Sequence, residues 1–68
     1  MARTIFLNGE PHPWDADRSV EALLAELEID TRTVAVERNR VVVKRAHYAQ
    51  TVITAGDEIE IVSFVGGG

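Results

Sequence analysis

The sequence predicts an α+β domain in which one main helix packs on one face of a mixed sheet of four to five strands. The chain contains nine Val and five Ile against four Leu, and β-branched residues favour strands. A single apolar stripe of helical period falls within residues 19–28. Elsewhere, apolar and polar residues alternate with the two-residue period of strands. One helix with one apolar stripe covers one sheet face, so two layers are expected.

The first predicted element is a hairpin. Residues 4–7 alternate between two faces, with Phe6 on the face opposite to its neighbours. Asn8-Gly9 is a two-residue hairpin signal because both residue types tolerate positive φ. The return strand, residues 10–14, contains two prolines that cannot donate to a ladder, so we expect it at an edge of the sheet. Trp14 is expected to cover an edge of the core.

A loop over residues 15–18 leads into the one main helix. Ser19 is a favourable N-cap, and Glu21 places negative charge in the first turn, where the helix dipole favours it. The helix is expected to end near Glu28. Its apolar stripe is formed by side chains spaced at i, i+3, i+4 and i+7, namely Val20, Leu23, Leu24 and Leu27.

The second half of the chain is predicted to return to strands. In order, we expect a strand (33–37), a tight turn (38–40), a strand (41–43), an irregular stretch with one helical turn (44–49), a short strand (51–53), a turn (55–57) and a final strand (58–65). Asn39 is the residue expected in a left-handed conformation. A hairpin, a crossover helix and a last strand returning parallel to the first give the β-grasp arrangement, with those two strands at the sheet centre.

Composition narrows the class of function. The absence of cysteine excludes disulfides and thiolate metal sites. Asp15 and Asp17 have no third ligand nearby, and no Ser-His-Asp or Cys-His set is present, so we expect neither a metal site nor independent catalysis. A net charge of −4 disfavours nucleic acid and anionic membranes and suits a basic protein partner. No apolar run long enough to span a membrane and no signal peptide is visible, so a cytoplasmic protein is expected. We also expect the protein to be monomeric when free.

The sequence closes with Gly66, Gly67 and Gly68. We expect a folded domain of residues 1–65 followed by a flexible glycine tail, 66–68. Without a Cβ atom, such a tail can thread a channel too narrow for side chains and present the Gly68 carboxylate at the far side. A terminus that merely frays is the alternative interpretation.

Four stretches, in this order, resemble those of a known family: Phe6–Glu10, Val34–Asn39, Gly56–Val62 and Phe64–Gly68. The sequence resembles the ThiS family, ubiquitin-like β-grasp sulfur carriers of the thiamine pathway. The one departure is the additional glycine, Gly66, ahead of the family's terminal pair. The small subunit of molybdopterin synthase shares the fold and the tail but is usually longer, so the length and the Val-Glu-Arg-Asn stretch favour the thiamine branch.

The resemblance implies a protein cosubstrate and not an enzyme. An E1-like adenylyltransferase (ThiF), which holds ATP and Mg²⁺, would adenylate Gly68, and a cysteine desulfurase system would supply sulfur to form a Gly68 thiocarboxylate. That group would donate sulfur to thiazole synthase (ThiG) for thiazole formation, with no cofactor bound to the carrier itself. Two alternatives stay open: a carrier for molybdopterin or another sulfur-containing product, and a noncovalent ubiquitin-like interaction module.

The tail offers little contact area, so the body of the domain is expected to supply affinity for partners. The candidate docking residues are exposed apolar side chains beside the tail: Val62, Phe64, Val65 and Phe6. Single exposed apolar residues are also ordinary on protein surfaces. Glu58 and Glu60 could pair with basic groups of a partner or form a solvated strand face. Residues 44–48 are expected to form a small basic spot on the surface.

Overall fold

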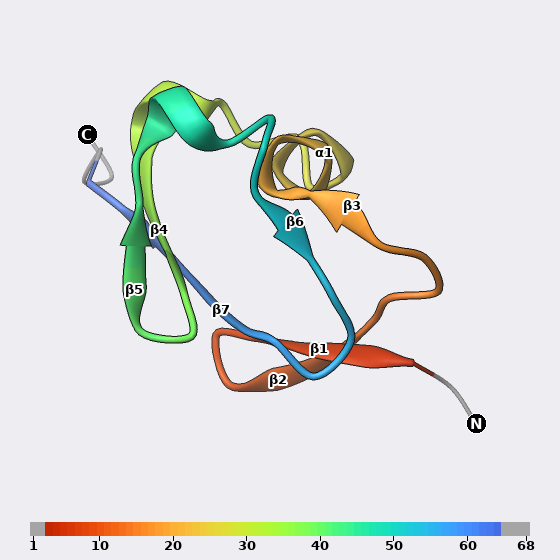
Figure 1. Cartoon of the computed structure of the whole chain (residues 1–68). Coiled ribbons are helices and arrows are strands. Elements are labelled where there is room, and N and C mark those ends of the chain that lie inside the picture. Colours follow the sequence, from red (N-terminus) through yellow and green to blue (C-terminus); the bar gives the residue numbers. More distant parts are fainter. Residues whose placement is uncertain (1–2, 65–68) are drawn as a thin grey trace.

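Within residues 3–64, which the computed structural model describes, five strands form a mixed sheet and one α-helix covers one of its faces (Figure 1). The strands are β1 (Thr4–Leu7), β2 (Glu10–Pro13), β4 (Val34–Arg38), β5 (Val41–Val43) and β7 (Glu58–Ser63), and the helix is α1 (Val20–Glu26). Their order in the sheet is β2-β1-β7-β4-β5. β1 and β7 are parallel neighbours, whereas the other pairs are antiparallel. The predicted β-grasp arrangement is confirmed, with β2 at an edge.

A second, two-stranded sheet in the described part of the chain pairs β3 (Arg18–Ser19) with β6 (Val52–Ile53). A short 3-10 turn, η1 (Thr31–Thr33), precedes β4, and a second one, η2 (Arg45–His47), follows β5. The prediction of a loop over residues 15–18 missed β3. A strand of two residues is too short to produce an alternating pattern, and its partner lies far along the sequence.

The apolar stripe of α1 determines which face the helix buries, and its caps determine its length. The Ser19 hydroxyl accepts a hydrogen bond from Ala22 N at 3.0 Å, as an N-cap does. The helix ends at Glu26, two residues before the predicted end, because Glu28 adopts a left-handed φ of 58°. Ile29 N donates to Leu24 O and Glu28 N to Ala25 O, which is the Schellman pattern of helix termination.

The core lies between α1 and the sheet. Its fully buried side chains come from every layer and include Ile5, Trp14, Val20, Leu23, Leu24, Val36, Ile53 and Ile59. Trp14 Nε1 donates to Ile53 O at 2.8 Å, which satisfies the buried indole. Tyr48 is 3% exposed and belongs to the core, so its predicted place in a basic surface spot was wrong. Burial of a large aromatic ring removes much apolar surface from water, so Tyr48 enters the core even though the residues around it are polar.

Two turns are joined by one carboxylate. Asp57 accepts hydrogen bonds from Arg38 Nε at 2.9 Å, Asn39 Nδ2 at 3.1 Å and Thr54 N at 2.9 Å. Burial opposes ionisation of Asp57, but these donors outweigh it and hold the pKa of its carboxyl below the ordinary value. Asn39 has the predicted positive φ, and Arg40 shares it. The network thus anchors the β4–β5 turn to the turn that precedes β7.

No helix among residues 3–64 is both long and apolar enough to cross a membrane.

We predict that Asp57→Asn lowers the free energy of unfolding by about 2 kcal/mol at pH 7, since charge-assisted hydrogen bonds are lost. The folded-state pKa of Asp57 lies below the unfolded value, so its contribution is fully present above about pH 4–5 and is lost as the pH falls through the folded pKa. Urea unfolding from pH 7 to pH 2.5 should therefore show the two proteins converging in acid. Asp17→Asn, which breaks the exposed ion pair with Arg3, is the control and should change stability little. Parallel curves for Asp57→Asn and the parent chain would contradict the prediction.

Candidate functional site

The described part of the candidate site is the base from which the predicted tail departs. β7 lies between β1 and β4, and Phe64 N still donates to Thr33 O at 3.2 Å beyond the end of the strand. Val65 and the tail residues Gly66, Gly67 and Gly68 lie outside the described residues, as does the predicted domain boundary.

Side chains of β7 alternate between the core and the outer sheet face. Ile59 is fully buried beneath α1, whereas Val62 and Phe64 are 56% and 64% exposed. Phe6 on the neighbouring β1 is 40% exposed. Three of the four predicted docking residues are therefore exposed, as expected, while their role in docking stays a prediction.

Strand register extends this apolar surface onto β4 and β5. Ala35 lies opposite Val62, and Val42 lies opposite Glu37 in the next pair. Val42 is 66% exposed and was not among the predicted docking residues. Three consecutive valines carry no alternation, so only the pairing with β4 could have assigned Val42 to the outer face.

An acidic area adjoins the apolar one on the same face. Glu37 and Glu60 are directly paired across β4 and β7, and Glu58 lies beside Phe6. Like charges directly opposite one another on a sheet are destabilising. Arg40 approaches Glu58 at 3.9 Å and compensates part of this charge. A cationic group of a partner placed over Glu37 and Glu60 would relieve the remaining repulsion.

Basic side chains surround the other end of the apolar area. A hollow of about 420 Å³ beside Phe64 is lined in part by Arg32, Lys44 and Arg45. Arg32 is already engaged, since its Nη2 lies 2.7 Å from Asp30 Oδ2. This side-chain hydrogen bond, together with one from the Arg32 backbone, lowers the pKa of Asp30 to about 2. Lys44 and Arg45 are the remaining cationic groups of the hollow.

Asn8 links the N-terminal hairpin to β7 through its side chain. Asn8 N donates to Ile59 O at 2.8 Å, as a strand residue would. Its φ of 50° then turns the chain into the hairpin, and its Oδ1 accepts from Ile61 N at 2.8 Å in place of the backbone carbonyl. The Asn8 Nδ2 lies 3.4 Å from Ile61 O, which is a weaker donation. The Asn-Gly signal predicted the turn but not this second function of Asn8.

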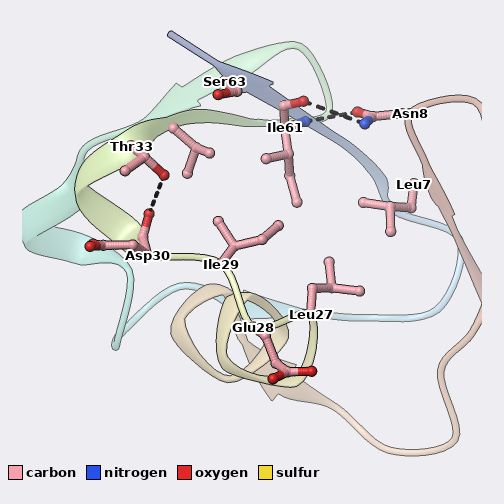
Figure 2. Close-up of a pocket in the computed structure, with 10 residues that line it drawn as sticks. Leu7, Asn8, Leu27, Glu28, Ile29, Asp30, Thr33, Ile61 and Ser63 are labelled. Carbon is pink, nitrogen blue, oxygen red and sulfur yellow. Dashed lines mark hydrogen bonds between the residues drawn. The ribbon is translucent and has the colours of Figure 1, made fainter. Parts of the chain in front are cut away.

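A groove of about 450 Å³ lies between the end of β7 and the segment that follows α1 (Figure 2). Its apolar lining comes from Leu7, Leu27, Ile29 and Ile61, which are half-buried and packed against the core. Asn8 lies at one end of the groove, and Ser63, Thr33 and Asp30 lie toward the other. The groove is on the helix side of the sheet, away from the outer face.

Comparisons with known proteins assign the chain to a family. The ThiS family model matches residues 5–68. The chain belongs to the ThiS family. It is 38% identical over 63 residues to the sulfur carrier protein ThiS of Bacillus subtilis, covering 91% of this chain and 96% of that protein. The crystal structure of the thiamine biosynthesis protein ThiS from Geobacter metallireducens superposes with a TM-score of 0.83 at 32% identity, covering 96% of this chain and 99% of that one.

Other relatives of this ThiS-family chain are much longer. The thiazole synthases of Paramagnetospirillum magneticum and Magnetococcus marinus are 50% and 48% identical to it over 64 residues. These matches cover 94% of this chain, which spans only 20% of the length of each synthase. In both proteins, the matching segment and the remaining four-fifths share one polypeptide.

We predict that Asn8→Gly, which retains freedom for positive φ but removes the side chain, lowers the free energy of unfolding by about 1 kcal/mol. Asn8→Asp retains the oxygen that accepts from Ile61 N and should lose less. Chemical denaturation monitored by Trp14 fluorescence measures both. Equal stability of Asn8→Gly and the parent chain would show that the side-chain contacts with Ile61 contribute nothing.

Proposed function

We propose that this chain is a sulfur carrier of thiamine biosynthesis and that the carboxylate of Gly68 is the group that carries the sulfur. The observation on which this rests is that the family match continues through residue 68 and so includes the glycine tail. The Bacillus subtilis relative, matched over nearly its whole length, bears the name of such a carrier. In this proposal, partner proteins bind the folded domain, and the glycine tail carries the reacting group.

The chemistry explains why an activating enzyme is required. A carboxylate is a poor electrophile, because resonance and negative charge repel nucleophiles. Attack of the Gly68 carboxylate on the α-phosphate of ATP releases pyrophosphate and gives an acyl-adenylate. The terminal sulfur of a desulfurase persulfide then attacks the acyl carbon and AMP leaves. A thiol reduces the resulting acyl disulfide, which leaves the Gly68 thiocarboxylate.

The proposed partners follow from these steps. An E1-like adenylyltransferase (ThiF) supplies the ATP and Mg²⁺ site, and a cysteine desulfurase supplies the sulfur. Thiazole synthase (ThiG) accepts the sulfur, a proposal supported by the two synthases that contain a segment similar to this chain. Among residues 3–64, no group of three His, Cys, Asp or Glu is placed to hold a metal ion. The chain is proposed as a protein cosubstrate because its own Gly68 carboxylate is the group that the partners modify.

A noncovalent interaction module is the second candidate. The exposed apolar side chains of the outer face, Val42, Val62 and Phe64, would serve such a module equally well. The two candidates differ in whether Gly68 is ever modified, so the mass of the C-terminal peptide decides between them.

We predict that the parent chain supports ATP–pyrophosphate exchange by the adenylyltransferase and gains about 16 Da on its C-terminal peptide when oxygen is replaced by sulfur. Deletion of Gly68 should abolish both. Gly67→Ala should greatly reduce both, because the added Cβ crowds the channel that the tail must thread. All three proteins should melt at similar temperatures, which serves as the control. A Gly68-deleted chain that is adenylated normally would contradict the proposal.

We predict that the outer face contributes to binding of the adenylyltransferase. Substitutions of Val41 and Val42 test this, because the two side chains are similarly exposed but lie on opposite faces of the sheet. Val42 and Val41 are 66% and 67% exposed, but adjacent strand residues point to opposite faces. Val42→Ser and Val62→Ser should each raise the KM for the carrier by about fivefold, whereas Val41→Ser should leave it unchanged. Equal effects of Val41→Ser and Val42→Ser would exclude a docking role specific to the outer face.

A further inference from the structure

The free hydrogen-bonding edge of β7 begins where β1 turns away. On the β4 side, Glu58 O accepts a hydrogen bond from Asn39 N and Phe64 N donates one to Thr33 O, at the residues that flank β4. The backbone groups of the intervening residues of β7 face β1 instead. Ile59 is an example, since its O accepts a hydrogen bond from Asn8 N. The position of Ser63 places its N–H and C=O on this β1 side. Pairing with β1 ends at Leu7 and Ile59. Ser63 is therefore paired with Val34 of β4 on one side, whereas within residues 3–64 no strand lies on its β1 side.

The side chain of Asn8 shows that this edge accepts a hydrogen-bonding partner beyond the end of β1. Its Oδ1 takes the place of the Asn8 backbone carbonyl and accepts a hydrogen bond from Ile61 N. One step further along β7, Ser63 is exposed and presents the next donor and acceptor of the same row. An extended segment entering here would continue the line of β1 in the plane of the sheet.

The groove shown in Figure 2 supplies a place for the side chain of such a segment. Successive side chains of a strand point to opposite faces, so every second side chain of an added strand would lie on the helix side. There it would meet the half-buried Leu7, Leu27 and Ile29. Backbone pairing together with a side-chain pocket is the pattern of strand addition at a sheet edge.

The position of Ser63 limits which protein can occupy this edge. Gly68 follows Ser63 by five residues, and an extended chain advances about 3.3 Å per residue. An enzyme that takes Gly68 into its active site therefore has its surface within about 17 Å of Ser63. Two thiazole synthases contain a segment about half identical to this chain in the same polypeptide, which favours the synthase over the activating enzyme.

We propose that thiazole synthase adds an extended segment to β7 at Ser63 and places an apolar side chain in the groove bounded by Leu7, Leu27 and Ile29. The proposal rests on the proposed function, since it identifies the surface by which a sulfur acceptor holds the carrier. The outer face around Val62 is then left to the activating enzyme. In this proposal, the activating enzyme binds the outer face of the sheet, whereas thiazole synthase binds the backbone edge of β7.

Ser63→Pro tests the edge directly. Proline lacks the N–H that faces the open side, while the bonds of β7 to β4 come from the alternate residues and are retained. Ser63→Ala removes the hydroxyl but keeps the N–H and is the matched control. With the thiazole synthase of the same organism, calorimetry should give a Kd about tenfold higher for Ser63→Pro, and a value within about twofold of the parent for Ser63→Ala. Equal affinity of the two variants overturns the proposal.

Amide hydrogen exchange of the parent chain provides a second test that requires no substitution. The Ser63 amide should exchange about tenfold more slowly in the complex with thiazole synthase than in the free carrier. An unprotected Ser63 amide in the complex overturns the proposal. Protection in the free chain that vanishes on deletion of residues 65–68 also overturns it, since the edge would then be occupied by the chain's own terminus.

The same samples distinguish failure of this inference from failure of the proposed function. Ser63→Pro should still support ATP–pyrophosphate exchange and acquire the added mass of the thiocarboxylate, because activation does not use the edge. If the parent chain never acquires that mass, the carrier function fails. If it does so and Ser63→Pro binds the synthase as the parent does, only the strand addition fails.

Discussion

Parallel pairing between β1 and β7 is the contact on which the remaining structure depends. It joins the two most distant strands of the sequence at the centre of the sheet, with β2 outside β1 and β4 outside β7. Parallel neighbours require a crossover connection, and α1 lies within that crossover, so the pairing also determines which face the helix covers. β7 pairs with β1 as far as Ile59 and with β4 as far as Ser63, so its course is fixed by its neighbours over its whole length.

Local signals predicted most of the elements, whereas contacts between distant residues could not be inferred from them. The Ser19 cap, the apolar stripe of α1 and the Asn8-Gly9 turn each depend on neighbouring residues and were predicted correctly. The β3–β6 pair, the bonds of Asp57 to Arg38 and Asn39, and the core position of Tyr48 depend on residues 18 or more positions away. No periodicity over a short window contains that information.

The candidate site shows the same division. Alternation along β7 was sufficient to place Val62 and Phe64 on the outer face. Val42 joins them only through its register against β4, and the groove requires the end of α1 to approach β7. Glu28 illustrates why the groove was missed: its left-handed φ ends the helix and directs Ile29 toward the core. A non-glycine residue in that conformation has no strong sequence signal.

Register connects stability to function in β7. Its odd-numbered side chains, such as Ile59 and Ile61, supply the core, and its even-numbered ones, such as Val62, supply the outer face. A slip of one residue would exchange the two sets and expose the isoleucines. It would also reverse which backbone groups face the open edge. The Asn8 side chain opposes such a slip because its oxygen meets an N–H only when Ile61 lies opposite it. A single side chain in the hairpin turn thus helps to fix which residues of β7 form the core and which form the outer face.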